Sequence, residues 1–126
     1  MSLSIHQVAV DCKNASLLSG FWSKVLGYGK EDWGEEHGAM VYSPEDSGLR
    51  IIFLPVPEQK VVKNRVHLDV RTEDDTREAE VERLVALGAR EIATRSFSTD
   101  RWTSTWTIMQ DPEGNEFCVS AEPATQ

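Results

Sequence analysis

One structural unit occurs twice in this chain of 126 residues, and the repeat constrains the fold more than any other feature. Residues 7–10 and 67–70 both have the pattern of a short strand. Each stretch is followed by a few polar residues and then by an amphipathic helix. Both helices are expected to end in the same dipeptide, Leu26-Gly27 in one copy and Leu87-Gly88 in the other. The repeat therefore predicts two modules built on one plan.

The two helices are predicted from apolar side chains that recur at helical spacing. The buried face of the first is expected to hold Leu18, Phe21, Trp22 and Val25. Asn14 or Ser16 can cap its start. The second helix is expected to bury Val81, Leu84 and Val85, with Asp74 and Asp75 beside its positive N-terminal end.

Three strands are expected after each helix. In the first copy a strand at 40–42 leads through a Pro- and Gly-containing turn to a second strand at 49–54. The corresponding strands of the second copy are expected at 106–109 and 115–120. A further strand is predicted near 29–33 and near 91–94. The prediction is one α+β domain of two βαβββ modules, about 3–56 and 64–121, joined by a linker at about 57–63. Modules of ~60 residues bury little surface alone, so we expect them to pair about a pseudo-twofold axis into an open, cup-like mixed sheet.

Composition limits the partners. The net charge is −8, with 21 acidic and 13 basic residues, and no basic patch is evident. Nucleic acid and anionic membrane surfaces are therefore not expected to bind. The start of the chain has no apolar signal segment, the longest apolar run is too short to cross a bilayer, and two cysteines make no disulfide framework. A cytoplasmic location is expected.

Three motifs carry a resemblance to a known family: FW…VLG at 21–27, HLDV at 67–70 and DPEGNEFC at 111–118. Together they resemble the glyoxalase / bleomycin-resistance / extradiol-dioxygenase superfamily, also called the vicinal oxygen chelate superfamily. Within it the chain looks closest to small glyoxalase-like domain proteins. The likeness covers nearly the whole chain in order, and the turn and strand at 111–118 are its most specific part.

The resemblance implies where a metal would bind. Metalloenzymes of this superfamily hold one divalent ion with four side chains, one from the first and one from the last strand of each module. Carried over, these positions are Gln7, Ile52, His67 and Cys118. The placement of Ile52 depends on matching Gly48 with Gly114, and a two-residue slip would give Leu54 instead.

This set departs from the family pattern. Gln7 and His67 are acceptable ligands, but Ile52 and Leu54 have no donor atom. Cys118 suits a thiophilic metal such as zinc and not magnesium or manganese. We therefore expect no catalytic metal and no other cofactor. The alternative is a single divalent ion such as zinc, held by Gln7, His67 and Cys118.

Side-chain alternation predicts what else faces the cup, because residues two apart on a strand point the same way. Ile52 and Leu54 give an apolar side, and His67, Asp69, Glu116 and Cys118 a polar one. The complete set expected to contact a ligand is Gln7, Arg50, Ile52, Leu54, Trp102, Trp106 and Cys118. The loop at 96–104 fits either a lid or an ordinary connection. Trp106 fits either the cup or the sheet core.

The expected function is binding of a small, partly apolar organic ligand in the cleft between the modules, without the family's metal. One alternative is a metal-dependent lyase, isomerase or dioxygenase of the vicinal oxygen chelate type. Another is a metal-free enzyme that transfers protons through His67, Asp69 or Glu116, although Glu116 fits an ion pair with Arg50 equally well. Glyoxalase I activity is not expected. The resemblance to drug-sequestering members implies a homodimer.

Overall fold

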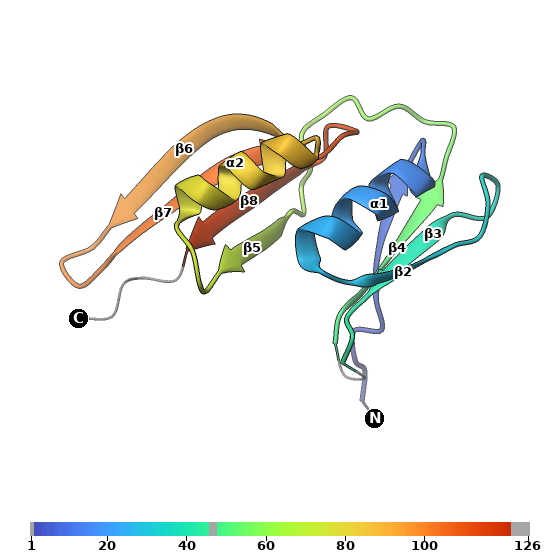
Figure 1. Ribbon diagram of the computed structural model, residues 1–126, viewed down its shortest axis with the longest axis horizontal. Helices are drawn as coiled ribbons and strands as arrows, with labels where there is room; N and C mark the ends of the chain where they lie inside the picture. The colour runs from blue at the N-terminus through green and yellow to red at the C-terminus, as the bar shows by residue number, and fades with distance from the viewer. Residues whose placement is uncertain (1, 46–47, 122–126) are drawn as a thin grey trace. The chain divides into compact units, whose positions relative to one another are not determined.

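The computed structural model describes residues 2–45 and 48–121 (Figure 1). The chain divides into two compact units, the first ending at Val61 and the second beginning at Val62. The elements of the first unit are β1 (Val8–Cys12), α1 (Ala15–Leu26), β2 (Gly29–Asp32), β3 (Ala39–Tyr42) and β4 (Arg50–Pro55). Those of the second are β5 (Leu68–Thr72), α2 (Arg77–Leu87), β6 (Arg90–Ser98), β7 (Thr103–Gln110) and β8 (Glu116–Ala121). The predicted pair of βαβββ modules is confirmed.

Each module has one mixed sheet of four strands, in the order β1-β4-β3-β2 or β5-β8-β7-β6. The first and last strands of a module pair in parallel, and the remaining pairs are antiparallel. Ala9 lies opposite Ile52 in the first sheet, and Asp69 lies opposite Cys118 in the second. Ile52, and not Leu54, is therefore the residue of the first module that corresponds to Cys118.

Helix α1 covers one face of the first sheet, and its termini follow the sequence signals. The Oδ1 atom of Asn14 accepts a hydrogen bond from the Leu17 amide at 3.0 Å, which caps the first turn. Gly27 ends the helix with a φ of 68°, in the left-handed region that glycine adopts without strain. The core of the module joins this helix to β3 and β4, and its largest members are Leu18, Phe21, Trp22, Val41, Ile51 and Phe53.

Helix α2 covers its own sheet through a narrower apolar stripe. It begins after Thr76, whose Oγ1 accepts a hydrogen bond from the Ala79 amide at 3.0 Å. Val81 and Leu84 are buried as predicted, but Val85 is 47% exposed. The prediction for Val85 was wrong because the stripe that faces the sheet is centred on Val81 and Leu84. Neither helix in the described ranges is long and apolar enough to cross a membrane.

Strands β6 and β7 form a long hairpin where the sequence predicted a short strand and a loop at 96–104 (Figure 1). The turn between them is closed by a hydrogen bond from the Thr99 amide to the Trp102 carbonyl at 2.8 Å. The stretch is therefore the outer part of a regular hairpin, with a short turn at 99–102. Its Ser- and Thr-rich composition suggested a loop, but the two strands bring those hydroxyl groups together on one face.

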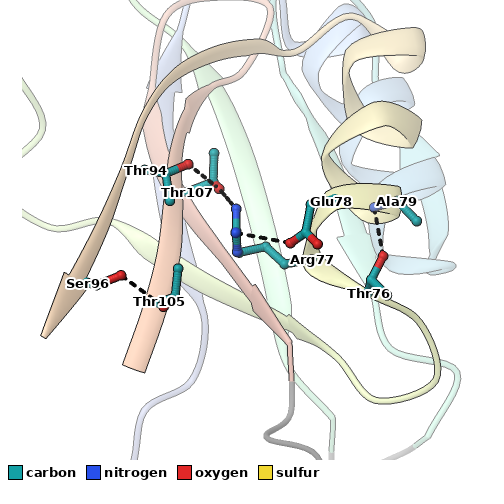
Figure 2. A network of polar contacts seen from close by, with 8 residues as sticks. All are labelled: Thr76, Arg77, Glu78, Ala79, Thr94, Ser96, Thr105 and Thr107. Carbon is teal, nitrogen blue, oxygen red and sulfur yellow. Dashed lines mark hydrogen bonds and ion pairs between the residues drawn. The ribbon is translucent and has the colours of Figure 1, made fainter. Parts of the chain in front are cut away.

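Paired hydroxyl groups explain why this hairpin is regular. The hydroxyl oxygens of Thr94 and Thr107 lie 3.0 Å apart, and those of Ser96 and Thr105 lie 2.9 Å apart. Figure 2 shows how these side chains face one another. Arg77, at the start of α2, donates a hydrogen bond to the Oγ1 of Thr107 at 2.6 Å and pairs with Glu78 at 3.0 Å. The contacts with Thr94 and Arg77 satisfy the buried hydroxyl of Thr107, which would be costly to leave unpaired.

The turn at 111–115 sets the start of β8. Asp111 is 4% exposed, and its Oδ1 accepts hydrogen bonds from the amides of Glu113 at 2.9 Å and Asn115 at 3.0 Å. The Asn115 side chain also donates to Asp111, and Gly114 takes a φ of 87°. One buried carboxylate thus defines where β8 leaves the turn and which of its side chains face α2.

We predict that Asp111→Ala lowers the free energy of unfolding by about 1–3 kcal/mol, because several partly buried donors lose their acceptor. Urea denaturation followed by circular dichroism measures the change. Asp100→Ala, in the exposed turn of the β6–β7 hairpin, is the matched control and should change stability by less than about 0.5 kcal/mol. Equal effects from the two substitutions would contradict this role of Asp111.

Candidate functional site

A pocket of about 440 Å³ lies on the face of the second sheet that α2 leaves open. Its lining comes from β5, β7, β8 and the segment before β5, and consists of Lys63, His67, Asp69, Ser104, Trp106, Ile108, Glu116, Cys118 and Ser120. Three of these residues form a row across adjacent strands, since Cys118 pairs with Asp69 on one side and with Ile108 on the other. Every lining residue belongs to the second compact unit, which begins at Val62.

Alternation along β7 and β8 decides which side chains reach this pocket. Phe117 and Val119 are buried on the helix side of β8, so Glu116, Cys118 and Ser120 face the open side. Thr107 and Met109 are likewise buried on the helix side of β7. Trp106 and Ile108 therefore face the pocket, which decides between the two orientations that the sequence left open for Trp106.

A polar cluster occupies one side of the pocket. His67 Nδ1 lies 3.0 Å from Asp69 Oδ1, and the two side chains are 38% and 71% exposed. Cys118 completes the cluster, since one potential ligand atom from each of the three residues lies within 4.8 Å of the others. Together with glutamate, histidine, cysteine and aspartate are the side chains that most often bind transition metals in proteins.

The thiol of Cys118 is held in its neutral form. Burial raises the pKa of Cys118, and the negative charge of Asp69 and a hydrogen bond to its carboxylate raise it further. The ammonium of Lys63 has the opposite, smaller effect on the pKa. Without a bound cation, Cys118 is consequently a weak nucleophile at neutral pH.

Glu116 makes hydrogen bonds through both carboxylate oxygens. The Asn64 amide donates to Oε1 at 2.8 Å, and the Gln110 side chain donates to Oε2 at 3.2 Å. The Asn64 side chain also donates to the Glu116 carbonyl at 3.4 Å. These bonds tie the segment before β5 to β8, so Glu116 acts as an anchor that places His67 at the pocket.

Four further residues predicted for the site belong to the first module. Gln7 precedes β1, and Arg50, Ile52 and Leu54 share one face of β4, opposite the buried Ile51 and Phe53, all within the first module. The row that corresponds to Asp69, Cys118 and Ile108 is Ala9, Ile52 and Met40, which offers no carboxylate, imidazole or thiol.

Trp102 is separated from Trp106. It lies at the turn of the β6–β7 hairpin, is 53% exposed and packs against Phe97 with ring centroids 5.7 Å apart. It lines a different pocket beside the start of α2. Three lining residues were not predicted from the sequence: Lys63, Ser104 and Ile108. Ser104 and Ile108 are each two residues from Trp106 on β7, so they follow once Trp106 is known to face the pocket.

Comparisons with known proteins agree with this architecture. The model of the glyoxalase-like domain family matches residues 7–120, so the chain belongs to that family. No curated protein matches the chain at a significant level.

Solved structures share the fold at low sequence identity. The fosfomycin resistance protein FosX from Listeria monocytogenes is 14% identical, with a TM-score of 0.73 over 98% of this chain and 96% of its own. A glyoxalase/bleomycin resistance protein/dioxygenase family enzyme from Burkholderia phytofirmans PsJN is 18% identical, with a TM-score of 0.63 over 91% and 95% of the two chains. A variant of the Listeria protein, 13% identical with a TM-score of 0.72 over 98% and 93% of the two chains, has been solved with Mn(II) and 1S,2S-dihydroxypropylphosphonic acid.

The residues of this chain do not fit a hard cation such as manganese at the four positions that the resemblance implies. Ile52 is a hydrocarbon, and Cys118 carries a thiol where the family uses a carboxylate. Manganese prefers carboxylate, carbonyl and water oxygens over sulfur. The first module thus offers Gln7 alone, so these four positions do not form a site for a hard cation.

We predict that Cys118 reacts with iodoacetamide at pH 8 more slowly than an unperturbed cysteine. Its raised pKa leaves less thiolate at that pH, because thiolate forms only as the pH approaches the pKa. Asp69→Asn removes the negative charge and should lower the pKa and speed alkylation, as followed by peptide mass spectrometry across a pH series. Cys12, which is buried in the first module, is the internal reference. Slower or unchanged reaction in Asp69→Asn would contradict this account.

Proposed function

We propose that this protein binds a small, partly apolar organic molecule in the pocket of the second module. The observation that carries the proposal is the lining, in which Trp106 and Ile108 stand on one sheet face with His67, Asp69 and Cys118. Ligand sites in proteins combine an apolar wall with a few polar groups that orient the ligand. A volume of about 440 Å³ lies in the range of such sites.

The lining indicates the class of ligand. The half-buried indole of Trp106 offers a flat surface for a planar or aromatic group, and Ile108 extends this surface along β7. Opposite charges from Lys63 and Asp69 border the same pocket, so a ligand with both a donor and an acceptor would be oriented. The similarity of fold to a fosfomycin resistance protein is consistent with a ligand of small organic type.

The proposed binding needs no metal, because all of these contacts come from side chains of the chain. Apo protein treated with a chelator should therefore retain affinity. Mn(II) should have no effect on it, since the positions that would hold a hard cation include Ile52 and Cys118.

The test is a screen of planar and aromatic compounds by tryptophan fluorescence on chelator-treated protein. A compound that enters the pocket should quench Trp106, and Trp106→Phe should remove most of that signal. Affinity, measured by calorimetry, should fall by roughly 2–13-fold in that variant, because the smaller ring loses about 0.5–1.5 kcal/mol of aromatic contact with the ligand.

Two matched variants locate the effect. Trp33→Phe, in the first module, and Trp102→Phe, at the hairpin turn, remove tryptophans that do not line this pocket and should leave the affinity unchanged. A screen without any binder, or a binder whose affinity depends on Trp102 and not on Trp106, would refute the proposal.

A further inference from the structure

We propose that His67, Asp69 and Cys118 form a site for a thiophilic divalent cation of the zinc class, contained entirely in the second module. One nitrogen, one oxygen and one sulfur atom lie within 4.8 Å of one another. The ligand set expected from the family resemblance combined His67 and Cys118 with Gln7. The structure instead supplies Asp69, which lies next to Cys118 in the sheet.

The geometry needs only side-chain adjustment. Donor atoms that share one tetrahedral zinc ion at bond lengths of about 2.0–2.3 Å lie roughly 3.5 Å apart. His67 and Asp69 already approach each other to 3.0 Å, and both are exposed enough to rotate toward the sulfur. The strand pairing of Asp69 with Cys118 holds the two backbones in place, so no movement of the chain is required.

The chemistry of the donors selects the metal. Imidazole nitrogen and thiolate sulfur favour zinc and cobalt over magnesium and manganese. Three protein ligands leave the fourth zinc position open, as in catalytic zinc sites. A water molecule or a polar group of the bound compound can take that position. The site goes beyond the proposed ligand binding and does not depend on it.

The two modules differ in the row that carries these donors. Ala9, Ile52 and Met40 replace Asp69, Cys118 and Ile108 in the first module, so the repeat itself offers an internal control.

Lys63 disfavours cation binding electrostatically, since its ammonium borders the same pocket. Its long side chain is exposed and can turn toward solvent, so it weakens the site without blocking it.

Titration of the full-length, chelator-treated protein with Co(II) tests the proposal. A cobalt–thiolate bond gives a charge-transfer absorption in the near ultraviolet, which reports sulfur ligation directly. We expect one equivalent of Co(II) to produce this band, Zn(II) to abolish it by displacement, and excess Mn(II) to leave it unchanged. Calorimetry with Zn(II) gives the affinity.

Variants assign the ligands. Cys118→Ser should abolish the band, and His67→Ala and Asp69→Asn should each weaken Zn(II) binding by at least about 10-fold, the lower end of the loss seen for outer-shell partners. The matched controls are Cys12→Ala, at a buried position of the first module, and His37→Ala, in an exposed loop, and neither should change the titration. Lys63→Ala should tighten binding.

Three results would overturn the proposal: no charge-transfer band in the wild-type protein, a band that survives in Cys118→Ser, or full zinc affinity in Asp69→Asn. Circular dichroism of each variant, with its urea midpoint, separates loss of a ligand from loss of the fold. Because the titration uses no organic compound, a failed ligand screen leaves this result standing, and a failed metal titration leaves the ligand screen standing.

Discussion

The parallel pairing of β5 with β8 is the constraint on which the second module depends. It places Leu68 opposite Phe117 and Asp69 opposite Cys118, so that one set of side chains faces α2 and the other the open face. The buried carboxylate of Asp111 determines where β8 enters that pairing. A slip of one residue would bury Cys118 and expose Phe117, and the apolar core that α2 covers prevents it.

The same pairing occurs in the first module with different chemistry. Its row of Ala9, Ile52 and Met40 is apolar, whereas the second module carries a carboxylate and a thiol in the corresponding places. The fold is thus repeated while the polar groups are concentrated in one copy. This asymmetry accounts for the poor match to a hard cation and supports a pocket that combines Trp106 and Ile108 with His67, Asp69 and Cys118.

Local signals predicted much of the backbone. Asn14 and Gly27 mark the two ends of α1, because capping needs only atoms that are neighbours in the chain. The DPEGN turn is likewise held by a residue of its own, Asp111. Both strands of the β6–β7 hairpin were predicted, but their length was underestimated because Ser and Thr are common in loops. Their hydroxyl groups become favourable only when a partner strand is present. Val85 was misplaced because the width of the buried stripe on α2 depends on what the helix packs against.

The sequence by itself determined the two βαβββ modules, the turn that begins β8 and the family to which the chain belongs, since these depend on periodicity, capping and short motifs. Only the tertiary structure decided that Trp106 faces the pocket, that Trp102 lies apart from it and that Asp69 stands beside Cys118. Periodicity gives the faces of a strand but not which face the helix covers. Strand pairing joins residues far apart in the chain, and its register is set by how the apolar side chains pack.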